Sequence, residues 1–209
     1  MNKNGFRFLS TETGKTIEEQ KKSLRSYMKE RRGNNENRDL KERLLIENFY
    51  RAIFGDSERA GTRLSVFIYL SFSSEAPTDG LIERLRSDGH IVYCPRIENG
   101  EMQAVAYGED FSLSEYGIRE PIGASFAEDS DVVVLPLLAV DKQGNRLGYG
   151  KGYYDRYLQS HKKAKRIAYA FDFQVVDSVP HTELDELVDV IVTEKRIIHC
   201  SSERKKLGS

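Results

Sequence analysis

The sequence predicts an α/β fold in which a mostly parallel sheet is flanked by helices on both faces. Short apolar runs alternate with helical stretches over most of the chain, a pattern typical of parallel strands joined by helices. Two amphipathic helical segments precede the first apolar run. With 209 residues, the chain can bury a sizeable core in one domain. We expect that domain over residues 16–200, between flexible tails at 1–15 and 201–209.

The first helix is expected to begin at Thr16. Thr16 and the glutamate three positions later have the spacing of a capping box. Three apolar residues then recur on one side of the helix: Ile17, Leu24 and Met28. Basic residues recur on another side, and because such a stripe is usually a solvated face, Lys29 and Arg32 are assigned to solvent. Lys21 and Arg25 lie one turn apart, so that their heads could converge on one anion.

A second helix is expected over residues 39–54, with Gly55 as its C-cap. Its predicted buried side chains are Leu40, Leu44, Leu45, Phe49 and Ile53. The predicted strands are residues 64–70, 91–94, 131–140, 166–171 and 188–193, with an added strand at 102–107. Further helices are expected at 78–88, closed by Gly89, and at 153–160. Because ligands bind at the carboxyl ends of strands in such sheets, the loops after 64–70 and 131–140 are the expected site.

Composition and charge exclude several classes of protein. The formal net charge is −1, and no apolar run approaches the roughly 20 residues that a membrane helix needs. Residues 1–63 hold 15 Lys and Arg against 10 Asp and Glu, which favours an anionic ligand but is too weak for a nucleic-acid binder. Cys94 and Cys200 are too few and too far apart for a disulfide framework or a zinc site. We therefore expect a cytoplasmic monomer that binds small molecules and neither membranes nor nucleic acid.

Residues 145–158, with the sequence NRLGYGKGYYDRYL, are the strongest indication of function. The glycines at alternate positions are Gly148, Gly150 and Gly152. They let backbone N–H groups approach an anion, and the N-terminus of the following helix favours phosphate. Arg146 and Lys151 add positive charge, and Asp155 adds a carboxylate of the kind that holds Mg²⁺ beside phosphate oxygens. The spacing is neither the Walker pattern nor the dinucleotide fingerprint, and the charged neighbours are what favour a nucleotide-phosphate site over a simple turn.

The same segment resembles the signature of 5-formyltetrahydrofolate cyclo-ligases, also called methenyltetrahydrofolate synthetases. The matching positions are Pro136, Ala139, Asp141, Gly144, Arg146, Leu147, Gly148, Gly150, Gly152, Tyr153, Tyr154, Asp155 and Arg156. Shorter matches extend the resemblance over residues 18–198, at 21–25, 73–78, 116–121, Gln174, Pro180, Asp185 and 188–194. Leu137 and Val140 depart from the common pattern, which affects packing rather than activity.

The resemblance implies a ribose-5-phosphate isomerase/CoA-transferase-like fold and an ATP-dependent ligase. The implied reaction is cyclisation of 5-formyltetrahydrofolate to 5,10-methenyltetrahydrofolate with release of ADP and phosphate, with Mg²⁺ as cofactor. The formyl oxygen would be phosphorylated, and N10 would then attack the activated carbon. Arg146 and Lys151 would stabilise the charge that develops on the transferred phosphoryl group.

The resemblance also implies a set of binding residues. ATP would contact Lys21, Lys22, Ser23, Leu24, Arg25, Arg146, Leu147, Gly148, Tyr149, Gly150, Lys151, Gly152, Tyr153 and Tyr154. The folate would contact Leu70, Glu75, Tyr149, Gly150, Lys151, Gly152 and Tyr153. Asp155 and Asp185 would hold the metal. The Glu75 carboxylate would accept two hydrogen bonds from the N3–H and 2-amino edge of the pterin.

Alternatives stay open at the level of sequence. Glu75 could be an acid near the start of a helix, Leu70 could belong to the core, and one of Tyr153 and Tyr154 could be a packing residue, with Tyr153 the expected ligand contact. Two other functions fit the glycine loop: a non-catalytic sensor of phosphate or nucleotide, and a sugar-phosphate isomerase of similar architecture. The sensor would not need Glu75, and the isomerase would need a carboxylate base and no ATP.

Overall fold

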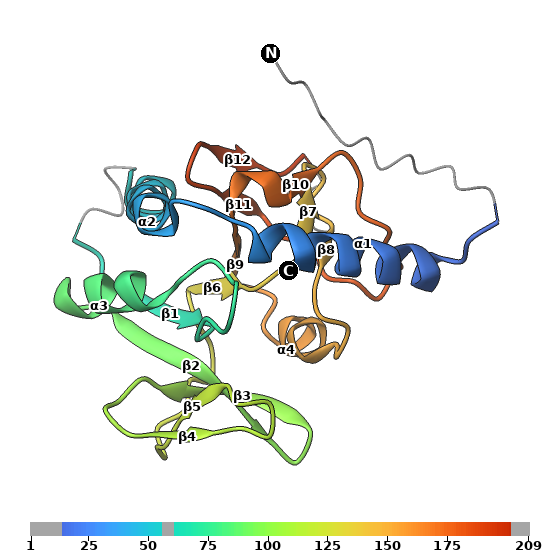
Figure 1. The fold of residues 1–209 in the computed structure, drawn as a ribbon. Coiled ribbons are helices and arrows are strands. Elements are labelled where there is room, and N and C mark those ends of the chain that lie inside the picture. Colours follow the sequence, from blue (N-terminus) through green and yellow to red (C-terminus); the bar gives the residue numbers. More distant parts are fainter. Residues whose placement is uncertain (1–13, 56–60, 202–209) are drawn as a thin grey trace.

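A seven-stranded sheet forms the centre of the structure, a computed structural model that describes residues 14–55 and 61–201 (Figure 1). Its strand order is β12-β11-β9-β6-β1-β2-β3. The strands are β1 (Ser65–Ile68), β2 (Ile91–Glu98), β3 (Glu101–Ala106), β6 (Val132–Leu135), β9 (Lys165–Tyr169), β11 (Val190–Val192) and β12 (Ile197–His199). The inner strands from β11 to β2 are parallel, and β12 and β3 pair antiparallel at the two edges. The predicted, mostly parallel sheet is confirmed, and so is the added strand at its edge.

Helices cover both faces of this sheet, as predicted. They are α1 (Ile17–Gly33), α2 (Arg38–Phe54), α3 (Asp79–Ser87) and α4 (Tyr153–Ser160), with a short 3-10 helix, η2 (Asp172–Gln174). Because side chains alternate along a strand, Val132 and Val134 pack in the apolar cluster that contains residues of α2 and α3. Val133 and Leu135 point the other way and pack with residues of α4. Strands that are apolar on both faces explain why the sequence shows continuous apolar runs.

Helix α1 packs on a separate three-stranded sheet of β10 (Val175–Val176), β7 (Ala139–Asp141) and β8 (Arg146–Leu147). The capping box at Thr16 is confirmed. The core between helix and sheet contains Leu24, Met28, Leu138, Ala139, Leu147 and Val179. This packing places α1 next to the glycine loop, residues 148–152, which joins β8 to α4 (Figure 1).

The predicted strand 131–140 is wrong, because it is two strands in two different sheets. Strand β6 ends at Leu135, and Pro136 follows it without an N–H for a further ladder bond. The chain then turns into β7 of the small sheet. This break brings the glycine loop, which lies beyond β7 and β8, back towards the end of β6.

Leu40 and Leu44, predicted to be buried, are exposed, and so is Ile17, which was placed on the same side of α1 as Leu24 and Met28. The buried side of α2 is instead the stripe at positions 45, 49 and 53, whose spacing of four residues faces the sheet. Arg32, assigned to a solvated face, is only 3% exposed, because α1 turns that side toward the connection after β6. The apolar pattern alone could not separate these neighbouring stripes.

A two-stranded sheet of β4 (Phe111–Leu113) and β5 (Arg119–Pro121) lies beyond the long β2 and β3 strands (Figure 1). The sequence did not predict it, since its strands are only three residues long. The expected tails, 1–15 and 201–209, lie almost wholly outside the described residues. No helix in the described ranges has the length and apolar character needed to span a membrane.

Candidate active site

A cavity of about 1290 Å³ opens at the carboxyl ends of β1 and β6. Leu70 lines it shortly after β1, and Pro136 lines it directly after β6. The charged side chains that line it are Glu18, Lys21, Arg25, Lys29, Arg32, Glu75, Glu115, Glu120, Arg146, Lys151, Asp155, Arg156 and Asp185. Both predicted site loops therefore meet in one place, as expected for a sheet of this type. The volume exceeds the roughly 300–1000 Å³ of a site for one small ligand, so two substrates can be accommodated.

The glycine loop holds two guanidinium groups close to its backbone. Gly150 has φ +96°, and a Cβ at this position would lie 3.3 Å from the guanidinium of Arg25. A Cβ at Gly148 would lie 2.9 Å from Nη1 of Arg146. Arg25 also donates from Nε to the Gly148 carbonyl at 3.0 Å. Because the two glycines have no side chains, the guanidinium groups of Arg25 and Arg146 lie against the loop that leads into α4. The backbone N–H groups at the N-terminus of that helix have no acceptor within the helix.

Arg146 is buried in β8 and forms an ion pair with Asp155 of α4. Its Nη2 lies 2.8 Å from Oδ1 of Asp155, which also accepts the Glu186 N–H at 3.3 Å. Within the described ranges, Nε of Arg146 is buried and has no hydrogen-bond partner. A buried guanidinium with an unused donor, facing a cavity, is suited to an anionic ligand.

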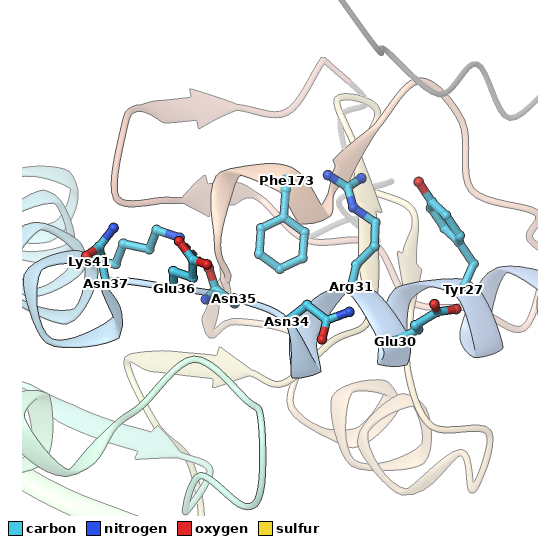
Figure 2. Close-up of a pocket in the computed structure, with 9 residues that line it drawn as sticks. All are labelled: Tyr27, Glu30, Arg31, Asn34, Asn35, Glu36, Asn37, Lys41 and Phe173. Carbon is cyan, nitrogen blue, oxygen red and sulfur yellow. Dashed lines mark hydrogen bonds between the residues drawn. The ribbon is translucent and has the colours of Figure 1, made fainter. Parts of the chain in front are cut away.

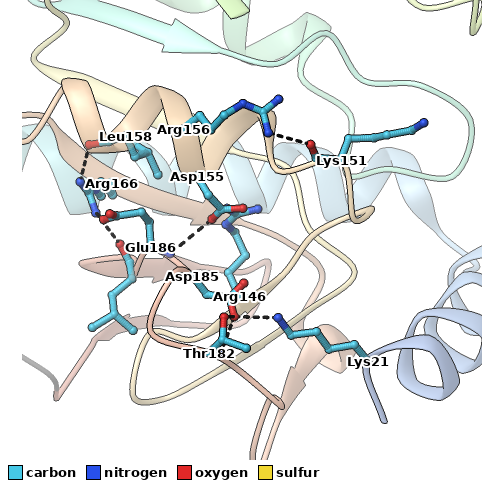
Figure 3. A network of polar contacts seen from close by, with 11 residues as sticks. Lys21, Arg146, Lys151, Asp155, Arg156, Leu158, Arg166, Thr182, Asp185 and Glu186 are labelled. Atoms are coloured by element: carbon cyan, nitrogen blue, oxygen red, sulfur yellow. Dashed lines mark hydrogen bonds and ion pairs between the residues drawn. The ribbon is translucent and has the colours of Figure 1, made fainter. Parts of the chain in front are cut away.

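Lys21 forms the second ion pair of the cavity, with Asp185. Its Nζ lies 2.7 Å from Oδ2 of Asp185, and Thr182 donates to the same oxygen from its N–H and its hydroxyl. Burial by itself would raise the pKa of Asp185, but the hydrogen bonds from Lys21 and Thr182 and the charge of Lys21 hold this pKa below its ordinary value. Figure 3 shows this pair in the same polar network as Arg146 and Asp155.

The two predicted metal ligands, Asp155 and Asp185, are each engaged through one carboxylate oxygen in these contacts. In the part of the chain that the structure describes, no group of three or more His, Cys, Asp or Glu side chains could hold a metal ion. Mg²⁺ beside a nucleotide needs only one or two protein carboxylates, because phosphate oxygens and water supply the other ligands. Oδ2 of Asp155 and Oδ1 of Asp185 fit that role, but only together with a bound phosphate.

Glu75 lies in the loop between β1 and α3 and is 8% exposed. Its Oε2 accepts the Phe72 N–H at 2.8 Å, and the Tyr149 hydroxyl hydrogen-bonds to the carboxylate. Burial raises the pKa of Glu75, while the two hydrogen bonds and the charge of Arg32 offset part of that effect. Leu70 is buried and also lines the cavity, so that its two predicted roles, core and wall, coexist.

Arg32 also lines the cavity, although the sequence interpretation assigned it to solvent. Its guanidinium donates to the Ser74 hydroxyl, the Leu137 carbonyl and the Tyr149 hydroxyl. A signal was present, since positions 21, 25, 28 and 32 are spaced by four, three and four residues and lie along one stripe of the helix. Three of these four residues are basic. Arg32 therefore lies on the same stripe as Lys21 and Arg25, which were predicted to contact ATP.

The other predicted residues are placed unevenly. Lys22 and Ser23 are exposed and Leu24 is in the core, and none of the three lines the cavity. Lys151 is exposed at the rim, with its ammonium 5.4 Å above the ring of Tyr116. The remaining predicted contacts of the glycine loop and α4 line the cavity: Leu147, Gly148, Tyr149, Gly150, Gly152, Tyr153 and Tyr154. Tyr154 also packs on the core, with its ring centroid 6.2 Å from that of Phe67.

A smaller hollow of about 480 Å³ lies between the end of α1, the start of α2 and η2 (Figure 2). Phe173 is one of the residues that line it, with the Arg31 guanidinium 5.0 Å from the centroid of its ring. None of the predicted site residues lines it. The large cavity is therefore the candidate active site.

Comparisons with known proteins identify relatives of this chain. Residues 17–194 match the sequence profile of the 5-formyltetrahydrofolate cyclo-ligase family. The 5-formyltetrahydrofolate cyclo-ligase of Mus musculus is 30% identical over 198 residues, which cover 86% of this chain and 96% of the mouse protein. That of Escherichia coli K12 is 33% identical over 144 residues, which cover 64% of this chain and 79% of the bacterial protein. The structure of Aquifex aeolicus 5,10-methenyltetrahydrofolate synthetase superposes with a TM-score of 0.73 at 29% identity, covering 90% of this chain and 96% of that one.

Proposed function

The chain belongs to the 5-formyltetrahydrofolate cyclo-ligase family, and we propose that the large cavity is where it binds both substrates and carries out the reaction. The activity is the ATP-dependent cyclisation of 5-formyltetrahydrofolate to 5,10-methenyltetrahydrofolate, with release of ADP and phosphate. One observation carries the assignment of the site: the glycine loop and its neighbours from Arg146 to Arg156 line this cavity and not the smaller hollow. Family membership favours the ligase over the sensor and the isomerase.

The triphosphate of ATP would lie along the glycine loop. Arg25 and Arg146 already lie against Gly150 and Gly148, and the unpartnered Nε of Arg146 is a donor for a phosphoryl oxygen. Lys151 at the rim has an exposed side chain that can follow the γ-phosphate. These groups are in place before the reaction, and such preorganised charge is the main way in which proteins accelerate phosphoryl transfer.

The pterin of the folate would bind at Glu75. Its carboxylate, held by the Phe72 N–H, is of the right kind to accept two hydrogen bonds from the N3–H and 2-amino edge. Leu70 would supply apolar wall to the ring, and Tyr149, which connects the glycine loop to Glu75, would lie between the two substrates. The formyl group and the γ-phosphate can then be aligned within one cavity.

The chemistry requires two successive displacements. The formyl oxygen attacks the γ-phosphorus of ATP, the bond from that phosphorus to the β–γ bridging oxygen breaks, and ADP leaves. N10 then attacks the activated formyl carbon, the bond from that carbon to the phosphorylated oxygen breaks, and phosphate departs with the N10 proton. Arg146 and Lys151 would neutralise the charge on the transferred phosphoryl group, and the bound substrates would displace water from around the activated carbon.

Asp155 and Asp185 would hold Mg²⁺ together with the phosphate oxygens. The ion would supply charge neutralisation at the β- and γ-phosphates. When ATP binds, Arg146 and Lys21 can exchange their carboxylate partners for phosphate oxygens, which releases both aspartates toward the cation. The two ion pairs thus keep the cations and the carboxylates close to the proposed phosphate site.

We further propose that the protein acts as a monomer in the cytoplasm. Cys94 and Cys200 are free thiols, which is consistent with a reducing compartment. Light scattering during size-exclusion chromatography tests the oligomeric state, and subcellular fractionation tests the compartment.

The decisive experiment follows methenyl absorbance after the protein is mixed with 5-formyltetrahydrofolate, Mg²⁺ and ATP. We expect absorbance to rise with ATP and to stay flat when ATP is omitted or replaced by its non-hydrolysable β,γ-imido analogue. A rise that does not depend on ATP, or no rise at all, would refute the proposed function.

A further inference from the structure

We infer that Arg32 is a positioning residue, which acts through Tyr149 to hold the Glu75 carboxylate in place for the folate. This inference rests on the proposed function, in which Glu75 binds the pterin. Arg32 lies at the end of α1 and is only 3% exposed. Burial of an arginine in this way requires partners for its donors, and those partners come from three separate parts of the chain.

The guanidinium of Arg32 joins the segments that build the cavity. Nε donates to the Ser74 hydroxyl at 3.2 Å, in the same loop as Glu75. Nη1 donates to the Leu137 carbonyl at 3.1 Å, in the connection after β6, and Nη2 donates to the Tyr149 hydroxyl at 2.6 Å, in the glycine loop. A planar group with donors in fixed directions holds the three segments in one arrangement, which the single ammonium of a lysine cannot do.

The direction of the hydrogen bonds follows from the chemistry of the groups. A guanidinium can only donate, so the Tyr149 oxygen must accept from Arg32. The Tyr149 hydroxyl proton is then left to donate to Glu75. Tyr149 is 41% exposed, yet its hydroxyl is the end that lies among these inner groups. Arg32 thus donates to Tyr149 and Tyr149 donates to Glu75, so the Glu75 carboxylate is oriented as an acceptor.

The charged and titratable groups around Glu75 come from every element packed against it. They are Arg32 from α1, Arg38 from α2, Tyr69 after β1, Tyr149 from the glycine loop and Tyr154 from α4. Burial raises the pKa of each of the three tyrosines, so they are neutral at neutral pH. Arg38 binds the backbone carbonyls of Ser74 and Glu75 rather than the carboxylate. Arg32 is therefore the cation that, through Tyr149, favours the ionised form of the buried Glu75.

Arg32→Met and Tyr149→Phe test this arrangement by methenyl formation measured from acidic to alkaline pH. Each variant should raise KM for 5-formyltetrahydrofolate by roughly tenfold, the effect of one lost charge-assisted hydrogen bond, and should raise KM for ATP much less. The acid limb of kcat/KM for the folate should move to higher pH, because Glu75 is more easily protonated without Arg32. The double variant should be no worse than the poorer single variant, since both changes break one chain. Arg32→Lys keeps the charge, so its acid limb should stay near that of wild type although KM rises.

Arg31→Met is the matched control, because Arg31 is the neighbouring basic residue of α1 and its guanidinium stacks on Phe173 outside the cavity. It should behave like wild type. An acid limb that does not move in Arg32→Met, or equal rises in the KM of both substrates, would overturn the inference. If Arg32→Met does not fold, Tyr149→Phe decides alone, because it removes one hydroxyl from a partly exposed side chain: a shifted acid limb supports the inference and an unshifted one overturns it. A wild-type protein without ATP-dependent methenyl formation would refute the proposed function itself, before any variant is compared.

Discussion

Replacing Arg146 by methionine should reduce turnover far more than it reduces stability. Arg146 is a buried cation in β8, directly before the glycine loop, with its side chain 4% exposed and an unused Nε donor. Loss of one group that stabilises the charge developing in the transition state raises the activation free energy by about 2.7–4 kcal/mol. This lowers kcat roughly 100- to 1000-fold. The stability loss should be smaller, about 1–2 kcal/mol, because Asp155 keeps the Glu186 N–H and partial contact with water. For a chain of this length, that corresponds to a fall in Tm of roughly 2–8 °C.

The measurement is kcat for methenyl formation, at a temperature where calorimetry shows both proteins folded. Arg146→Lys should lie between wild type and Arg146→Met, because lysine keeps the charge without the forked donors. The matched control is Arg96→Met: Arg96 is also largely buried and pairs with Glu98 at 3.2 Å, but it does not line the cavity. If Arg146→Met turned over as fast as Arg96→Met, the assignment of the glycine loop as the phosphate site would be wrong.

Further predictions concern the neighbouring residues. Lys21→Met should raise KM for ATP and lower Tm, because Asp185 loses its buried partner; a KM equal to that of wild type would remove Lys21 from the site. The pKa of Asp185 is lowered in the folded state, so its carboxylate stabilises the fold above the unfolded-state value of about 3.9 and loses that contribution as the pH falls through the folded-state pKa. Urea titrations should show this acid-induced loss in wild type and less of it in Asp185→Asn. Glu75→Gln should raise KM for 5-formyltetrahydrofolate and not for ATP, and equal rises would contradict a pterin contact. Gly150→Ala should push Arg25 from the loop, raise KM for ATP and destabilise the fold by about 1–3 kcal/mol through its positive φ, whereas unchanged kinetics would show that the contact does not serve ATP.

Much of the fold could be predicted because its signals are local. The capping box at Thr16 and the helix at Tyr153–Ser160 are set by residues within a few positions of each other, and both were predicted correctly. The continuous apolar run at 131–140 identified a buried strand, but not the turn within it at Pro136. That turn depends on the small sheet that receives β7, which no local pattern describes.

The residues that line the cavity were predicted in part, for the same reason. The glycine loop and its charged neighbours are contiguous in sequence, so their chemistry was visible without a fold. Lys22 was grouped with Lys21 because they are adjacent, yet on a helix adjacent side chains point in different directions, and only Lys21 reaches the cavity. Arg32, eleven positions after Lys21, was assigned to solvent although it lies on the same side of the helix as Lys21.

The family, the alternation of strands and helices and the chemical character of the glycine loop could all be read from the sequence. Each of them depends on the order of residues over short distances. Which cations of α1 face the cavity, and which carboxylates they meet, depends on how the folded chain packs. A helix has no inner side until a particular sheet packs against it. The partners of Arg32 come from segments that are distant in the chain, and these segments become neighbours only in the folded sheet.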